Sequence, residues 1–219
     1  MDKVIIYGDG SLAIDACREL NEQGQFEVAG FTAEQCQGKA PAEFGLPFVP
    51  FANVSEKFPA DEYKMLVAVG FRQLNNYRAK RYEMAKKMGY QFINCVNSQC
   101  HSWSTYTTGV GDNCQFGPRS VVHPTAKIGK NVIIGPGAMV AHLCVVEDHC
   151  YIDAAALING SVRIGAYSYI GANANLRNRV NIGRECMIGA GALIMDDIDD
   201  REVCVGKAAP VSTTMPVTE

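Results

Sequence analysis

The chain has 219 residues, which is enough for one large domain or two small ones with a sizeable core. Its formal net charge is −3 with both signs interspersed, so it carries no basic patch of the kind that binds nucleic acid. No apolar run approaches the length of a membrane span, and the first residues enter a strand pattern directly. We therefore expect a cytoplasmic protein without a membrane or nucleic-acid partner.

Residues 1–97 predict a small α/β domain, because strand and helix patterns alternate as they do around a parallel sheet. Strands are expected over residues 3–8, 26–31, 63–70 and 91–96. One helix is expected over residues 11–20, with Ser11 as its N-cap and Gly24 just beyond its end. A second helix is expected over residues 75–88, capped by Asn75 or Asn76.

The segment YGDGSLA at residues 7–13 has the G-x-G-x-x-A pattern of a nucleotide-binding turn between a strand and a helix. Glycines let the backbone approach a phosphate, and the helix N-terminus attracts its charge. The domain is half the size of a full dinucleotide fold, so a nucleotide-linked sugar fits better than NAD, and a merely structural turn is the alternative. The expected binding residues are Gly8, Gly10, Ser11, Leu12, Gly70 and Arg72.

Several basic residues are expected to stay in solvent. Arg72 either reaches a phosphate or is a solvated arginine. The second helix carries five further basic residues that predict a solvated face: Arg78, Lys80, Arg81, Lys86 and Lys87.

The sequence pattern changes after residue 97, and a second domain is expected over residues 98–219. Every sixth residue from Val110 to Ile194 is apolar, fifteen in a row, and glycine follows eight of them. This hexapeptide repeat predicts a parallel β-helix in which the aliphatic residue points inward and the glycine fits a crowded corner. Three hexapeptides make one triangular coil, so residues 18 apart lie one above the other, with about five coils between residues 105 and 198.

Nine cysteines, an odd number without a C-x-x-C pair, predict reduced thiols in small buried positions rather than disulfides or a metal site. The four histidines are too widely spaced for a metal site, and no metal is expected. His142 stacks between Pro124 and Gly160 and is expected to leave the coil at a corner, where the missing side chain of Gly160 leaves room for a ligand. His149 is expected to be structural.

Four segments together resemble the NeuD/PglD-type sugar acetyltransferases of the hexapeptide-repeat class: IIYGDGSLA, VAVGFRQLN, HPTAKIGKNVIIGPGAMVAHLC and IGAGALI. The resemblance covers nearly the whole chain. It implies a half-Rossmann-like α/β domain followed by a left-handed parallel β-helix, acetyl-CoA as acyl donor, a homotrimer, and active sites between neighbouring prisms.

The resemblance also implies site residues. The family's general base lies in an H-D-C or H-E-C triplet, which matches His142-Leu143-Cys144 without the acidic residue. Either another group, Asp153, Asn159 or a backbone carbonyl, therefore orients His142, or His142 is a weaker base. Tyr151 stands where the family has a second histidine on the acetyl-CoA side. The glycine whose N–H meets the thioester carbonyl matches Gly160. Positions that contact CoA match Ala172 and Ala190, and Lys207 is a candidate in the tail.

The expected reaction is acetylation of a nucleotide-linked amino sugar, of the 4-amino-4,6-dideoxy type, for bacterial surface-glycan synthesis. An imidazole is mostly neutral at pH 7 and can take a proton from an attacking amine. Cys144 is an alternative acyl carrier, but it follows the small-residue core pattern. Two alternatives for the whole chain stay open: acetylation of a sugar hydroxyl, and a catalytically silent trimer that binds nucleotide sugars.

Overall fold

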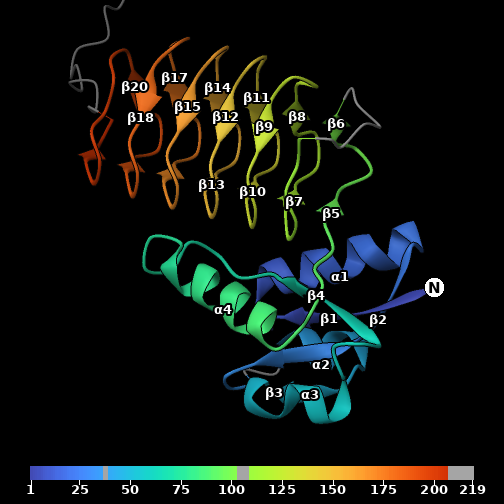
Figure 1. Ribbon diagram of the computed structural model, residues 1–219. Helices are drawn as coiled ribbons and strands as arrows, with labels where there is room; N and C mark the ends of the chain where they lie inside the picture. Colours follow the sequence, from blue (N-terminus) through green and yellow to red (C-terminus); the bar gives the residue numbers. More distant parts are fainter. Residues whose placement is uncertain (37–38, 103–108, 207–219) are drawn as a thin grey trace, which may run out of the picture.

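The computed structural model describes residues 1–36, 39–102 and 109–206. It consists of an α/β domain on which a parallel β-helix, here called the prism, is stacked, and α1 and α4 lie on the side of the α/β domain that is nearest to the prism (Figure 1). The elements of the α/β domain are β1 (Asp2–Tyr7), α1 (Ser11–Gln23), β2 (Phe26–Ala33), α2 (Lys39–Phe44), β3 (Phe48–Pro50), the 3-10 helix η1 (Phe51–Asn53), α3 (Val54–Lys57), β4 (Tyr63–Val67) and α4 (Asn76–Lys87).

The α/β sheet is parallel, as predicted, in the order β3-β2-β1-β4. Apolar side chains cover both of its faces: one cluster joins β1 to α1, and the other joins β1 and β4 to α4. The predicted elements in this domain are present with shifted ends. Four further elements, α2, β3, η1 and α3, were not predicted, because they are too short to show a helical or strand periodicity in the sequence.

Three details of the α/β domain differ from expectation. Gly10, not Ser11, is the N-cap of α1, and it makes no side-chain cap bond. Asn75 does precede α4, but its side chain does not cap the helix. The stretch expected as one strand over residues 91–96 divides between the domains: Phe92 bridges Met65, whereas β5 (Cys95–Val96) pairs with the prism.

The prism has three faces of two-residue strands, named here sheets I, II and III. Sheet I contains β5, β7 (Gln115–Phe116), β10 (Ile133–Ile134), β13 (Tyr151–Ile152), β16 (Tyr169–Ile170), β19 (Met187–Ile188) and β21 (Val203–Cys204). Sheet II contains β6 (His101–Ser102), β8 (Val121–Val122), β11 (Met139–Val140), β14 (Leu157–Ile158), β17 (Asn175–Leu176) and β20 (Leu193–Ile194). Sheet III contains β9 (Lys127–Ile128), β12 (Val145–Val146), β15 (Arg163–Ile164) and β18 (Asn181–Ile182).

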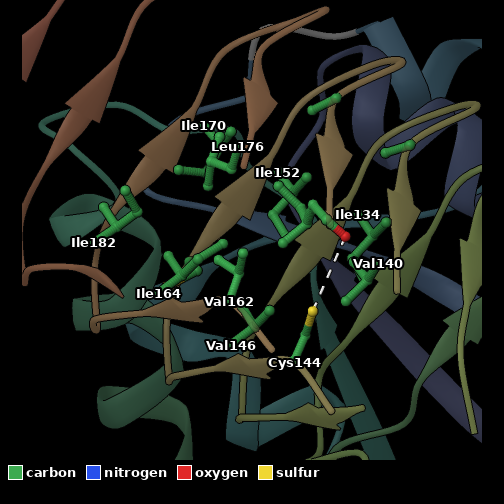
Figure 2. Packing of buried hydrophobic residues seen from close by; sticks show 14 of the residues in the cluster. Ile134, Val140, Cys144, Val146, Ile152, Val162, Ile164, Ile170, Leu176 and Ile182 are labelled. Atoms are coloured by element: carbon green, nitrogen blue, oxygen red, sulfur yellow. Dashed lines mark hydrogen bonds between the residues drawn. The ribbon is translucent and has the colours of Figure 1, made fainter. Parts of the chain in front are cut away.

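The prism core follows the predicted repeat. Residues 18 apart pair between coils, such as Val140 with Ile158, and the lattice residues from Phe116 to Ile194 are buried (Figure 2). Small residues four places after each lattice position fill the remaining space, and buried thiols take this role at Cys114, Cys144, Cys150 and Cys186. The predicted small core positions are therefore confirmed for these four cysteines, whereas Cys36 is exposed.

The glycines after the lattice residues are required by crowding, as predicted, and not by backbone twist. A Cβ on Gly171 would lie 2.6 Å from the backbone nitrogen of Ala190 in the next coil. The left-handed residue of each corner comes two places later, as at Leu143 (φ 57°) and His149 (φ 65°).

Sheet I faces the α/β domain, and the basic residues of α4 are not all solvated there. Arg78 is fully buried and Arg81 is largely buried, whereas Lys80, Lys86 and Lys87 are exposed. The prediction of a solvated basic face is therefore wrong for both arginines, because α4 packs between the α/β sheet and the prism.

Candidate functional site

His142 lies at the corner between sheets II and III, two residues after the end of β11. Its backbone belongs to the coil, since its carbonyl accepts a hydrogen bond from Ser161 N at 2.8 Å. Its side chain is exposed, and the next residue, Leu143, is 60% exposed. The corner position predicted for His142 is confirmed.

The imidazole of His142 lies against Gly160 in the coil above. A Cβ on Gly160 would come within 2.5 Å of Nε2 and 3.0 Å of Nδ1 of that ring. The stacking predicted from the repeat is therefore correct, but the space beside Gly160 is filled by the imidazole and is not empty.

The backbone N–H of Gly160 is not needed by the coil. Proline, which has no N–H, occupies the same place in the repeat at Pro118, Pro124 and Pro136. Among the hydrogen bonds between described residues, none uses Gly160 N as donor. A free N–H beside an exposed imidazole is an arrangement that can donate to a developing oxyanion while the ring takes a proton.

The residues expected to orient His142 bond elsewhere. Asp153 accepts hydrogen bonds from Tyr169 and from the backbone of Ala154, and Asn159 donates to Asn175 and to Leu176 O. The ring nearest to His142 is that of His123, with centroids 5.9 Å apart in an edge-on arrangement.

Thr125, in the preceding coil, bonds to residues on both sides of this corner and was not predicted as part of the site. Its hydroxyl accepts a hydrogen bond from Leu143 N at 3.0 Å and bonds to Nδ1 of His123. The signal was available, because Thr125 lies 18 residues before Leu143 in the repeat.

Cys144 and His149 are buried and belong to the scaffold. The Cys144 thiol is fully buried and bonds to Asn159 O at 3.0 Å, and burial raises its pKa, which disfavours the thiolate that an acyl carrier needs. His149 contacts Asn131 Nδ2 at 2.9 Å, and burial lowers its pKa. The structural role expected for His149 agrees with this environment.

The other residues assigned to the acetyl-CoA side lie at other places on one prism. Ala172 and Ala190 are at the corner between sheets I and II, across sheet II from His142 and Gly160. Tyr151 lies on the outer face of sheet I, with its ring 5.8 Å from that of Phe71, and burial raises its pKa. One chain alone does not bring these residues together. Lys207 lies outside the described residues.

A second site lies in the α/β domain, at the carboxyl ends of β1, β2 and β4. A cavity of about 460 Å³ there is lined by all the residues predicted to bind the nucleotide: Gly8, Gly10, Ser11, Leu12, Gly70 and Arg72. The glycine at position 8 is required, since φ is +128° and a Cβ would lie 2.5 Å from Ala68 O. Parallel sheets bind ligands at this edge.

An aromatic and charged cluster closes one side of this cavity and was not predicted. Arg81 pairs with Glu34 at 2.7 Å, donates to Tyr7 Oη at 2.9 Å, and stacks on the Tyr77 ring at 4.3 Å. Burial, with the hydrogen bond to Tyr77, raises the pKa of Tyr7. Burial is the largest influence on the pKa of Arg81 and lowers it, but the hydrogen bond to Tyr7 and the charges of Tyr7, Tyr77 and Glu34 together raise this pKa overall. Glu34, the acidic residue after β2, is therefore fixed by a cation.

Two further features of the described residues concern metal ions and membranes. Within the ranges that the structure describes, no group of three or more His, Cys, Asp or Glu side chains could hold a metal ion. No helix in those ranges is long and apolar enough to cross a membrane.

Comparisons with known proteins found one matching protein family and several solved structures with a similar fold. Residues 107–142 and 143–178 match the family of bacterial transferase hexapeptides (six repeats). A comparison with curated protein sequences gave no match. Among solved structures, the chain is similar to the acetyltransferase domain of PglB from Neisseria gonorrhoeae FA1090, at 24% sequence identity and a TM-score of 0.82, covering 94% of this chain and 97% of that one.

Two further structures are similar over the same length. PerB from Caulobacter crescentus, solved with CoA and GDP-perosamine, has 24% identity and a TM-score of 0.80, covering 94% of this chain and 95% of that one. WeeI from Acinetobacter baumannii AYE has 21% identity and a TM-score of 0.78, covering 94% and 97%. The chain thus contains bacterial transferase hexapeptide repeats in a left-handed β-helix, and it has the two-domain fold of these acetyltransferase structures.

Proposed function

We propose that this protein is an acetyl-CoA-dependent N-acetyltransferase that acts on a nucleotide-linked amino sugar, of the 4-amino-4,6-dideoxy type, in bacterial surface-glycan synthesis. The observation that carries the proposal is that one chain combines the contact of His142 with Gly160 on the prism and a nucleotide-sized cavity in the α/β domain. A similar fold in PerB was solved with CoA and GDP-perosamine, a donor product and a nucleotide sugar.

The cavity in the α/β domain suits the nucleotide diphosphate. The N-terminus of α1 opens into it, and its free N–H groups attract phosphate. Gly10 there leaves open space, since a Cβ on it would meet no atom within 4 Å. Arg72 adds a positive charge at the rim, where its guanidinium stacks 5.1 Å from the Tyr77 ring.

The outer face of sheet II supports assembly with further copies of the chain, which we propose is a homotrimer. The side chains that point outward along this face are mostly apolar, and Met139 and Leu193 are 41% and 64% exposed. The equivalent positions on sheet III include Lys127, Arg163 and Asn181, and those on sheet I include Tyr151 and Tyr169, which pack against Phe71 of the α/β domain. A mostly apolar outer face such as that of sheet II suits contact with further copies of the chain.

This assembly would also complete the transfer site. The corner with His142 and Gly160 and the corner with Ala172 and Ala190 border the two opposite edges of sheet II. If sheet II faces the three-fold axis, each corner of one kind meets the other kind on a neighbouring subunit. Small side chains at Ala172 and Ala190 then leave a groove for the pantetheine of acetyl-CoA.

The chemistry follows from the residues at the His142 corner. His142 takes the proton that the sugar amine loses as it attacks the thioester, and the Gly160 N–H donates to the oxyanion. Collapse of this tetrahedral intermediate breaks the C–S bond, and the leaving CoA thiolate takes the proton from His142 to become the free thiol. Cys144 is buried away from solvent, so transfer is direct and needs no acyl-enzyme. The absence of a carboxylate beside His142 favours an amine over a hydroxyl, because an alcohol requires the stronger base.

The test is release of free CoA thiol from acetyl-CoA in the presence of a panel of nucleotide-linked amino sugars, with the product identified by mass spectrometry. The proposal requires turnover that depends on the sugar amine. Acetylation of matched sugars that carry a hydroxyl in place of the amine would instead show an O-acetyltransferase. Binding of nucleotide sugars without release of CoA thiol from acetyl-CoA in the presence of any of them would show a silent binding protein.

A further inference from the structure

Arg78 of α4 is the most deeply buried charged side chain in the interface between the two domains. It is 0% exposed, and five hydrogen bonds reach oxygen atoms on both domains. Its acceptors are Asn75 Oδ1, Asn131 Oδ1 and the carbonyls of Asn131, His149 and Cys150, at 3.0–3.2 Å. Its guanidinium also lies 5.8 Å from the centre of the Tyr151 ring.

No carboxylate balances this charge, since no ion pair among the described residues includes Arg78. Burial lowers its pKa to about 10, which still leaves the side chain charged at neutral pH. A buried cation held only by neutral oxygens pays a large desolvation cost, and an apolar side chain of similar volume would avoid it. Arg78 therefore adds little to the stability of the fold. It is well suited to fixing the relative position of the two domains, because a planar guanidinium with five N–H donors fits only one arrangement of acceptors.

The segment before Arg78 supports the same reading. Gln73, Leu74 and Asn75 are three consecutive residues in the left-handed region, with φ of 53°, 49° and 64°. Such a conformation is unfavourable for residues other than glycine. Asn75 holds it in place: its amide donates to the carbonyls of Tyr167 and Ser168 on the prism, and its Oδ1 accepts from Arg78.

This strained segment continues into the nucleotide cavity. Gly70 and Arg72 line the cavity, and Phe71 between them packs on Tyr169 of the prism with ring centres 4.4 Å apart. The loop therefore connects the rim of the cavity to the surface of sheet I, and Arg78 bonds to the end of that loop.

A chain of asparagines extends the network to the α/β sheet. Asn131 accepts from both Arg78 and Asn113, and Asn113 bonds to the backbone N–H and C=O of Val67 at the end of β4. β4 leads directly into the cavity through Gly70. All three polar side chains are fully buried. A satisfied buried network of this kind specifies one relative position of the elements that it joins.

We propose that Arg78 is a positioning residue for the transfer reaction, which fixes the nucleotide-binding domain on the prism in the one orientation that delivers the bound sugar to the transfer site. This inference rests on the proposed function. Arg78 lines neither the cavity in the α/β domain nor the corner with Ala172 and Ala190 that is assigned to acetyl-CoA. Its loss should therefore lower turnover without weakening the binding of either substrate. A displacement of the acceptor by about 1 Å is enough to cost about 100-fold in rate.

The experiment compares Arg78→Met and Arg78→Lys with Lys80→Met, an exposed position on the same helix. For Arg78→Met we expect kcat with the nucleotide sugar to fall by about 10- to 100-fold. The KM for acetyl-CoA, and the affinity for UDP or GDP measured by calorimetry, should stay within about twofold of the parent values. Arg78→Lys keeps the charge but not the planar fork, so its kcat should lie between those of the parent and Arg78→Met. Lys80→Met should match the parent.

Two results would overturn the assignment. One is a kcat within about threefold of the parent for both folded Arg78 variants. The other is a parallel loss of nucleotide affinity, acetyl-CoA affinity and melting temperature, which would show a purely structural role. Hydrogen exchange measured by mass spectrometry gives a readout that is independent of turnover and of the proposed function. In the Arg78→Met protein the amides of residues 67–75, which the network holds against the prism, should exchange faster than in the parent, and unchanged exchange there would also reject the assignment.

Discussion

The imidazole of His142 occupies the place that a side chain on Gly160 would take. A Cβ on Gly160 would come within 2.5 Å of Nε2 of His142, so the two residues are complementary in shape across adjacent coils. The histidine needs the glycine to adopt this position, and the glycine leaves its N–H next to the ring. We propose that these two residues take part in the chemistry, whereas the buried residues of the same coils build the prism.

Replacement of His142 by asparagine should remove the proton acceptor and leave the coil intact. General-base loss typically lowers turnover by about 10²- to 10⁴-fold. Because the side chain is exposed at a corner, the melting temperature and the subunit assembly should stay at parent values. Thiol-release kinetics check this, with Lys130→Asn as the control, because the exposed Lys130 has the same place in its hexapeptide but lies at the corner between sheets III and I. Turnover of His142→Asn within about threefold of the parent would place the base elsewhere.

Alanine at position 160 should act on the same step through shape alone. The new methyl group would collide with the end of an exposed side chain, which can rotate away, so Gly160→Ala should fold normally but lose turnover by at least about tenfold. Gly165→Ala is the matched comparison. Its Cβ would lie 2.6 Å from the backbone carbon of Gly183, which cannot move, so about 1–3 kcal/mol or more of stability should be lost. Equal unfolding free energies for the two variants would contradict this distinction.

The repeat made the prism predictable in detail, because a period of six fixes both which residues are buried and which residues stack. The pairing of Val140 with Ile158 and the contact of His142 with Gly160 both follow from a spacing of 18. The nucleotide cavity was also predictable, since a strand, a glycine turn and a helix N-terminus lie together at the carboxyl edge of a parallel sheet.

Contacts between the domains were not predictable, because no period connects α4 to the prism. Arg78 looked like a solvated residue, since charged residues surround it in sequence, yet it is fully buried. The local environment of His142 was also misjudged. Asp153 is near in sequence, but its carboxylate bonds to Tyr169 at 2.7 Å, whereas Thr125, which is distant in sequence, reaches the corner through the coil below.

The groove expected at the corner between sheets I and II can be tested at Ala172. A tryptophan there should obstruct the pantetheine and raise the KM for acetyl-CoA by about tenfold or more, with a smaller effect on the KM for the sugar. Arg184→Trp provides the control, because Arg184 occupies the same place in its hexapeptide but lies at the corner between sheets III and I. An unchanged KM for acetyl-CoA in folded Ala172→Trp would show that the groove lies elsewhere.

The outer face of sheet II should hold the trimer together. Met139→Glu places a charge in the proposed contact, and we expect the mass by light scattering to fall from three times 23.8 kDa to the mass of one chain. Turnover should fall with it, because the two corners then no longer meet. Val145→Glu makes the matched change at the same place in a hexapeptide on sheet III and should leave a trimer. Dissociation by Val145→Glu instead would assign the interface to sheet III.

The buried position of His149 should make stability depend on pH. Burial lowers its pKa in the folded protein, whereas the unfolded chain titrates near the ordinary value of about 6.5. Below that pH the unfolded state binds a proton that the folded state does not, so the free energy of unfolding should fall with acidification. The slope should be at most about 1.4 kcal/mol per pH unit for one group.

Denaturant unfolding of the parent and of His149→Gln between pH 5 and pH 8 measures this effect. Glutamine does not titrate, so the variant should lose less stability than the parent between pH 7 and pH 5, even if it is less stable overall. If the parent and His149→Gln show the same pH dependence, acid sensitivity arises from other groups. Since His149 also offers its carbonyl to Arg78, a loosened domain interface at low pH is the structural change that should accompany the loss of stability.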